Sequence, residues 1–265
     1  MLGLLAASLA ADSSKRCDVK DHLRSAGGLP DDCTALDFQF EQLTPKEVRA
    51  TAYALNVGTV SVFVCRGCKL GAYGMEVLEP ALLKAPLQFV TIREDELGAL
   101  GGRTLARVLN ETSLPGMDLR AAGLDAEGGV ELARALRGND ALEILNLKAS
   151  GVDTQGAEAI VDALRENRML QWLDLSFNKL GDSGALALAE MLTEKEGAIK
   201  LMLEDPSIGE EGQEALKKVK EEQKDRHELM LPPESHKPQH RMPRRGSPRK
   251  IDKMMEYSSE TKEEL

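Results

Sequence analysis

The chain repeats itself every 27 or 28 residues, and this period limits the folds available to it more than any other feature. One apolar position marks every unit, at successive spacings of 27, 27, 27, 28, 28 and 28 residues. The marking residues are Leu43, Leu70, Leu97, Leu124, Val152, Leu180 and Ile208. A period of this length predicts a supersecondary unit whose copies stack and share one continuous core.

Each unit is expected to contain a short strand, a turn and a helix. Ahead of the marking residue, apolar side chains alternate, as Leu173 and Leu175 do, and alternation is typical of a strand. In the last six units a glycine follows the marking residue by four positions. Apolar residues four apart, such as Leu188 and Leu192, then indicate the buried stripe of a helix.

The clearest copy, residues 170–180 (LQWLDLSFNKL), resembles the leucine-rich-repeat template of Leu, Leu, Leu, Asn and Leu at the required offsets. The unit length and the Gly-x-x-x-Leu helix resemble the ribonuclease-inhibitor-like subfamily. That subfamily includes the repeat domains of NOD-like receptors, Ran GTPase-activating protein and the C-terminal domain of tropomodulin. The resemblance implies an α/β fold, a curved solenoid or partial horseshoe with a parallel β-sheet on the concave face and α-helices on the convex face.

The repeats divide the chain into four expected parts. Residues 1–32 form an N-terminal segment, with a candidate signal peptide at 1–10 followed by a cap. Residues 33–220 hold seven repeats of 27–28 residues, and 221–231 are expected to end a C-terminal capping helix. Residues 232–265 are rich in Pro, Ser, Lys, Arg and Glu and predict a disordered charged tail.

Composition excludes some classes of function and leaves the compartment open. The net charge of -10 argues against nucleic-acid binding, and no apolar run is long enough for an integral membrane segment. The apolar N-terminus lacks a preceding positive charge, but the last four residues, KEEL, resemble a retention signal of the endoplasmic-reticulum lumen. Cytoplasmic localisation is favoured, with the endoplasmic-reticulum lumen as the alternative.

The cysteines suggest metal or redox chemistry until the repeat frame is applied. Cys65 and Cys68 form a Cys-x-x-Cys pair. Cys65, however, falls in a strand core column, and Cys68 falls at the turn position that Asn178 occupies, so both are interpreted as structural. A disulfide between Cys17 and Cys33 is left open, because it depends on the compartment.

No catalytic residue, cofactor site or metal site is predicted, and the chain is not expected to be an enzyme. All four histidines lie outside the repeats, so no nucleophile, base and acid can be assembled. The glycine pairs Gly101-Gly102 and Gly128-Gly129 occupy helix-entry positions of the repeat rather than a phosphate-binding loop.

The strand side chains that point away from the core form three stripes on the concave face. One stripe is largely apolar, the central one is polar, and the third is basic in four successive units. The residues expected to contact a partner are Val62, Arg66, Phe89, Arg93, Asp118, Arg120, Ile144, Asn146, Lys148, Trp172 and Asp174. Cations about 4.8 Å apart repel one another unless carboxylates offset them, and aromatic and Arg side chains are common binding hot spots.

The expected function is therefore a non-catalytic module or scaffold that binds a protein partner with an acidic or mixed surface, and the chain is expected to be a monomer. A GTPase-activating regulator resembling Ran GTPase-activating protein and a tropomodulin-like actin-binding module are the alternatives. Two modification sites are also candidates: Ser247, which lies in a basic stretch before a proline, and Asn110, an acceptor for glycosylation if the protein is lumenal.

Overall fold

A computed structural model describes residues 16–17, 33–57 and 59–232. Nine parallel strands of the described chain form one sheet, in chain order from β1 to β9. The strands are β1 (Arg16–Cys17), β2 (Ala35–Gln39), β3 (Val62–Arg66), β4 (Phe89–Arg93), β5 (Gly116–Asp118), β6 (Ile144–Asn146), β7 (Trp172–Asp174), β8 (Lys200–Met202) and β9 (Glu228–Met230). The helices are α3 (Pro45–Val57), α4 (Gly71–Leu82), α5 (Gly98–Glu111), α6 (Asp125–Gly138), α7 (Thr154–Glu166), α8 (Gly181–Glu194) and α9 (Glu210–Glu222).

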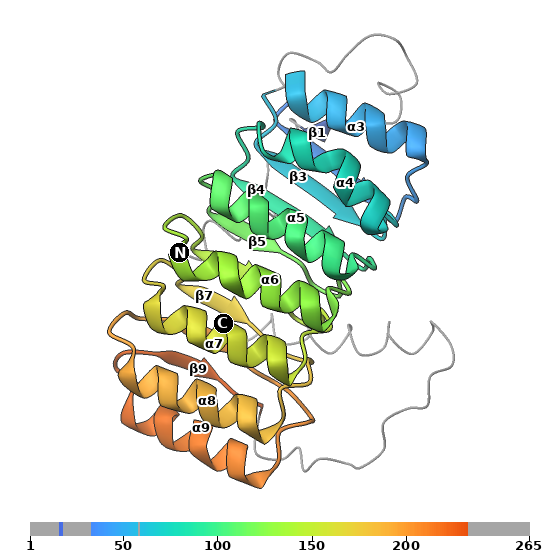
Figure 1. The fold of residues 1–265 in the computed structure, drawn as a ribbon. Helices are drawn as coiled ribbons and strands as arrows, with labels where there is room; N and C mark the ends of the chain where they lie inside the picture. Colours follow the sequence, from blue (N-terminus) through green and yellow to red (C-terminus); the bar gives the residue numbers. More distant parts are fainter. Residues whose placement is uncertain (1–15, 18–32, 58, 233–265) are drawn as a thin grey trace, which may run out of the picture. The chain divides into compact units, whose positions relative to one another are not determined.

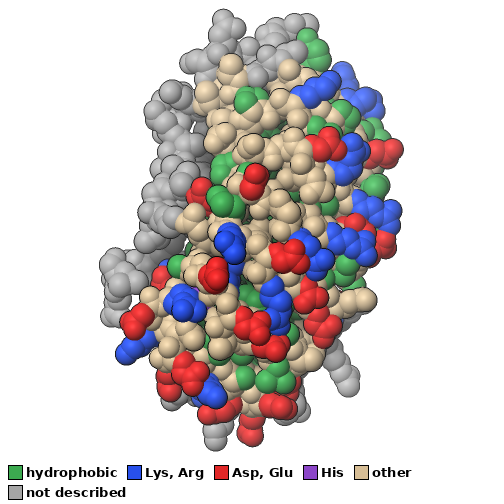
Figure 2. Space-filling model, turned by 60° about the vertical axis from the view of Figure 1, so that its left-hand side comes forward, with side chains coloured by type: hydrophobic (Ala, Val, Ile, Leu, Met, Phe, Trp, Pro, Cys, Tyr) green, Lys and Arg blue, Asp and Glu red, His purple; other side chains and the backbone are tan. Residues whose placement is uncertain are grey.

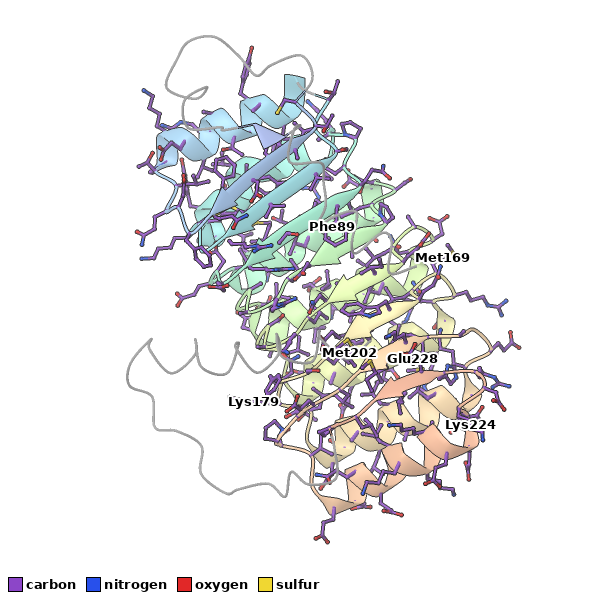
Figure 3. The ribbon with its side chains drawn as sticks, turned by 180° about the vertical axis from the view of Figure 1, so that it is seen from behind. Phe89, Met169, Lys179, Met202, Lys224 and Glu228 are labelled. Carbon is purple, nitrogen blue, oxygen red and sulfur yellow. A yellow bond between two sulfur atoms is a disulfide. The ribbon has the colours of Figure 1, made fainter. Side chains whose placement is uncertain are left out.

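Strands and helices alternate along the chain and form two layers. Helices α3 to α9 lie side by side over one face of the sheet (Figure 1). The opposite face, which the strands present toward the viewer in Figure 3, carries none of the described helices. A strand and a helix joined this way cannot cover both of their apolar faces alone, so neighbouring units complete one another's core. The predicted α/β solenoid is confirmed.

The sequence period is also the register of the sheet. Val62 pairs with Phe89, and Phe89 pairs with Gly116, each one repeat further along the chain. Gly116 then pairs with Ile144, and Ile144 with Trp172, again at steps of one repeat. Residues that share a position in the repeat therefore form columns across the sheet, as predicted.

The marking residues and the inward strand residues build the core. All seven marking residues are buried, from Leu43 at one end to Ile208 at the other. Inward strand residues such as Phe63, Leu145 and Leu173 are completely buried. One apolar cluster runs through every unit, which is the continuous core that the repeat predicts.

Polar side chains at the turn position hold neighbouring units together. The Asn178 amide donates to the carbonyls of Leu147 and Leu175 at 2.8 Å, and its oxygen accepts from the Val152 amide at 3.1 Å. Asp95, at the same turn position three units earlier, accepts from the two backbone amides at the start of α4 at 2.9 and 3.0 Å. Both side chains satisfy backbone groups that the tight turn leaves without partners.

A second series, the helix-end ladder, consists of Asn139, Asn167 and Lys195, the residues that follow α6, α7 and α8. Each side chain donates to a carbonyl in the last turn of the helix one unit earlier (α5, α6 and α7 respectively), at 2.6 Å for Asn139 and Asn167 and 2.9 Å for Lys195. All three are buried. The ladder supplies donors to helix carbonyls that lack partners within their own helices.

Two glycines allow α5 and α6 to approach at backbone distance. A Cβ atom built on Gly102 would lie 2.3 Å from the Cα atom of Gly128, closer than two carbon atoms can approach. The glycine pairs of the sequence therefore serve helix packing, in agreement with their interpretation as repeat positions.

The C-terminal end differs from the prediction. The capping helix was expected to run through residues 221–231, but α9 ends at Glu222, and Glu228–Met230 forms the ninth strand. The helix prediction is wrong because Leu229 continues the strand column of Leu201, with which it pairs, and is buried beneath the sheet. Leu229 follows Leu201 at the same repeat step as in the other units, so the sequence already contained the signal for this strand.

The N-terminal cap is described only in part. Arg16–Cys17 forms a short strand that pairs with β2 through Ala35 and Leu36, an element that the sequence analysis did not predict. The candidate signal peptide at 1–10, the remainder of the predicted cap and the predicted tail from residue 233 onward lie outside the described residues.

Candidate functional site

The candidate site is the face of the sheet that faces away from the helices. Phe89 comes to it from β4, whereas Met202 and Glu228 come from the last two strands (Figure 3). Its residues form an apolar column, a central column and a basic row, in the register that the sequence predicted. The basic row consists of Arg66, Arg93, Arg120 and Lys148.

The apolar column is less accessible than its sequence suggests. Phe89 is 6% exposed, and its ring lies over Gly116, where a Cβ atom would come within 2.3 Å of the ring. Ile144 is 9% exposed, while Val62 and Trp172 are half-buried. Of this column, Val62 and Trp172 therefore offer the more accessible side chains.

The central column is polar and buried from β5 to β7. Asp118, Asn146 and Asp174 are each at most 3% exposed. Each side chain accepts a hydrogen bond from the backbone amide two residues later, at 3.1, 3.0 and 2.9 Å respectively. These bonds stabilise the turn where the chain leaves each strand.

The basic row is only partly neutralised by the central column. Arg93 forms an ion pair with Asp118 of the next unit, and the nearest Arg120 nitrogen is 3.9 Å from the same carboxylate. The Lys148 ammonium lies 5.0 Å from the centre of the Phe177 ring, a cation–π contact. Asp118 therefore pairs mainly with Arg93, and its interaction with Arg120 is longer and weaker.

Burial and mutual repulsion determine the electrostatics of the basic row. Burial and repulsion by Arg93 lower the pKa of Arg66 and of Arg120, although Asp118 acts in the opposite direction on both. The Nε atoms of Arg66, Arg93 and Arg120 are buried without an acceptor among the described residues. The nearby carboxylates therefore do not fully offset the combined effect of burial and of repulsion by Arg93 on the pKa values of Arg66 and Arg120.

Burial also acts on a carboxylate of the site. Desolvation raises the pKa of Asp174, against hydrogen bonds from Ser176 and attraction by Lys148 and Arg120. The ionised form of Asp174 is therefore less favoured than that of a solvated carboxylate.

Aromatic residues stand at both ends of the basic row. Phe40 and Phe177 occupy the same position of their repeats and share a left-handed backbone conformation, with φ of 56° and 57°. Phe40 is 67% exposed and lies against Gly67, whereas Phe177 is half-buried. The sequence analysis missed both, although each falls one residue beyond the basic stripe of the repeat.

The last two strands add an apolar patch that the sequence analysis also missed. Met202 pairs with Asp174 on one side and with Met230 on the other. Met230 is 45% exposed, and Met202 is half-buried, like Trp172 on the preceding strand. We call Trp172, Met202 and Met230 the methionine patch. Extending the central column of the repeat by two further units would have found its methionines.

The cysteine pair occupies the predicted positions in the core and the turn, and it is covalently linked. Cys65 and Cys68 are both completely buried and form a disulfide across three positions, a bond that the sequence analysis did not predict. Cys33 is disulfide-bonded as well. Cys65 and Cys68 thus fill the core and turn positions assigned to them, and Arg66 lies between them in the sequence.

The outer surface of the helices has a different electrostatic character. Ion pairs link neighbouring helices there, for example Arg103 with Glu127 and Arg165 with Glu190. Acidic and basic side chains are interspersed over the surface that Figure 2 presents. Asn110, the candidate glycosylation acceptor, is exposed near the end of α5, whereas Ser247 lies outside the described residues.

The described residues include one buried histidine. His227 is buried, and its Nε2 atom lies 2.9 Å from the Leu192 carbonyl oxygen, beside the helix-end ladder. No group of three or more His, Cys, Asp and Glu side chains in this part of the chain could hold a metal ion. None of its helices is long and apolar enough to cross a membrane.

Comparison with known proteins agrees with this architecture. Residues 166–189, which include β7 and the start of α8, match the family model of the leucine-rich repeat. The fold is a leucine-rich-repeat solenoid. Such repeats are typically non-catalytic interaction scaffolds, so the match suggests a protein-interaction module. No curated protein matches the chain in a sequence search.

Proposed function

We propose that this leucine-rich-repeat protein binds a protein partner through the sheet face, and that the basic row recognises an acidic segment of that partner. The supporting observation is the incomplete neutralisation of the row. Arg93 has a close carboxylate partner, whereas the nearest Arg120 nitrogen is 3.9 Å from the same carboxylate, and burial and repulsion by Arg93 lower the pKa of Arg66 and of Arg120. Carboxylates of a partner would pair with the accessible part of these guanidinium groups, such as that of Arg120, whose side chain is 36% exposed, and charge-assisted bonds to arginine are strong and directional.

A parallel sheet suits this role because it presents equivalent positions at regular intervals. Arg66 and Arg93 are register partners, one strand apart, and neighbouring strands are separated by about 4.8 Å. An extended acidic segment that crosses the strands can therefore meet one cation per strand. Rigid placement lowers the entropy lost on binding, since β3 and β4 fix the backbones of Arg66 and Arg93, and the hydrogen-bonded turn after β5 holds that of Arg120.

The test measures binding of a fluorescein-labelled polyglutamate peptide by anisotropy. The triple variant Arg66→Gln, Arg120→Gln, Lys148→Gln removes three charges of the row but keeps Arg93, whose loss would leave the buried Asp118 without its partner. The matched control Lys84→Gln, Lys179→Gln, Lys224→Gln removes three charges from exposed lysines elsewhere.

We expect the row variant to bind at least tenfold more weakly, about 1.4 kcal/mol, and the control to change binding less than threefold. Binding by wild-type protein should also weaken between about 0.05 and 0.5 M NaCl, because exposed charges are screened. Equal losses in the row variant and the control would show that only net charge matters and would contradict the proposal. GTPase activation and actin binding rest on likeness of fold alone and are not proposed.

A further inference from the structure

The sheet face has a basic end and an apolar end. Their order along the sheet indicates how the partner is arranged, in addition to its charge. The basic row occupies the units of β3 to β6, whereas the methionine patch lies on β7 to β9. In the column of Trp172, the next two strands carry Lys200 and Glu228, which pair at 2.7 Å and neutralise one another. The patch is therefore an apolar surface next to a basic one.

We propose that the partner segment has two parts, an acidic block that contacts the basic row and an apolar anchor that packs on the methionine patch. This inference rests on the proposed function and specifies the partner of the same face. The two parts belong to one segment because the basic row and the patch lie on consecutive strands of one sheet face: Lys148 follows β6, which pairs with β7, and β7 pairs with β8, which carries Met202.

The chemistry of the patch favours an aliphatic or aromatic anchor. Met230 and Met202 are flexible, polarisable side chains that adapt to different apolar shapes, and Trp172 adds a rigid aromatic surface. Met230 is 45% exposed, unlike the core residue Leu229 beside it, which is 5% exposed. An apolar partner group would remove this exposed surface from water, which is the main source of affinity at such contacts.

The strand spacing sets the separation of the two parts. Lys148 and Met202 are two units apart, and Arg120 and Met202 are three units apart. At about 4.8 Å per strand the separation is roughly 10–15 Å, which an extended peptide covers in about three to five residues. We therefore expect a spacer of about four residues between the last acidic residue and the anchor.

The experiment uses synthetic peptides as probes and the full chain as the protein. One labelled peptide carries a glutamate block, a Gly/Ser spacer of about four residues and a Leu-Leu anchor, and a second has the reverse order. A third peptide has the glutamate block and spacer only. Each is titrated by anisotropy into wild-type protein, the double variant Met202→Gln, Met230→Gln, and the row variant Arg66→Gln, Arg120→Gln, Lys148→Gln.

Leu100→Gln, Leu186→Gln is the matched control for the methionine variant. These leucines are also partly exposed, at 38% and 37%, but lie on α5 and α8. Thermal unfolding of each variant establishes that it is folded before binding is compared.

The proposal expects at least one anchored order to bind wild-type protein about tenfold more tightly than the acidic peptide. That gain should disappear in the methionine variant and persist in the leucine control. If the acidic peptide binds and depends on the row, but neither order gains from the anchor, the two-part inference is wrong while the proposed function stands. If no peptide depends on the row, the proposed function fails as well. A gain that survives in the methionine variant also overturns the inference, because the anchor then binds elsewhere.

Discussion

The turns inside the solenoid and the basic row on its sheet face both repeat polar residues with the same period, but their surroundings differ. Asn178 uses both its amide and its oxygen on backbone groups of neighbouring units. Arg66 and Arg120 instead lie beside other arginines, and their Nε atoms have no acceptor in the described chain. The comparison teaches that repetition alone does not reveal a binding residue. Satisfied polar groups stabilise the array, whereas unsatisfied ones provide capacity for a ligand.

Asn178→Ala should have the largest effect on stability. The substitution removes two donors and one acceptor, and leaves buried carbonyls of Leu147 and Leu175 with fewer partners. We expect the free energy of unfolding to fall by roughly 3 kcal/mol, measured by urea denaturation. Asn110→Ala, at an exposed helix position, is the control and should change it by less than about 0.5 kcal/mol. Similar losses of unfolding free energy in both variants would contradict the proposed difference between internal and surface amides.

The next prediction compares two carboxylates of one column. Asp118→Asn removes the charge that pairs with Arg93 and should lower the free energy of unfolding by about 1–3 kcal/mol. Asp174→Asn should leave stability unchanged or increase it, because burial already disfavours the charged form and raises the pKa of Asp174. Asn146 shows that an amide can make the same turn bond. Chemical denaturation at pH 7 measures both, and a larger loss for Asp174→Asn would contradict the electrostatic account.

Lys195 offers a smaller test within the helix-end ladder. Lys195→Ala should lower stability by about 1–2 kcal/mol, because it removes the donor to the carbonyls of Leu164 and Asn167. Lys195→Asn should retain most of the wild-type stability, since the equivalent residues 139 and 167 are asparagines with nearly the same backbone angles. Burial also lowers the pKa of Lys195, a penalty that the amide avoids. Thermal unfolding that ranks alanine equal to asparagine would show that the ladder contributes no stability.

The smallest expected effect is a loss of folding stability at acidic pH. Burial lowers the pKa of His227 below its usual value of 6.5, with Arg226 and Lys195 also opposing protonation. Between the lowered folded pKa and 6.5 the unfolded chain binds more protons, so stability falls as the pH falls through that interval. We expect a loss below about 1 kcal/mol, reduced in His227→Gln, when urea denaturation is compared at pH 7 and pH 5. An identical pH dependence in the variant would remove His227 from the explanation.

The repeat made most of the fold predictable. A nearly constant step from unit to unit determines the strand register and the core columns, so Cys65 could be placed in the core without coordinates. The prediction failed after Glu222, where the charged sequence resembled a continuing helix and the single buried Leu229 was a weak strand signal.

The site was predictable in position but not in its interactions. The columns of Arg93 and Asp118 followed from the period, yet the preference of Asp118 for Arg93 over Arg120 depends on side-chain conformation. The burial of Phe89 likewise depends on a neighbour without a side chain, Gly116, which leaves space for its ring. The disulfide between Cys65 and Cys68 required the geometry of the turn as well as its sequence.

The sole tryptophan gives the most direct test of the claim that the sheet face binds the partner. Trp172 begins β7, the strand between β6, which precedes Lys148, and β8, which carries Met202, and it is half-buried. Titration with the anchored acidic peptide, which contains no tryptophan, should shift its emission to the blue and reduce quenching by acrylamide. Both changes should saturate together with anisotropy and be absent in the variant Arg66→Gln, Arg120→Gln, Lys148→Gln. Saturable peptide binding that leaves the emission and quenching of Trp172 unchanged would contradict the account.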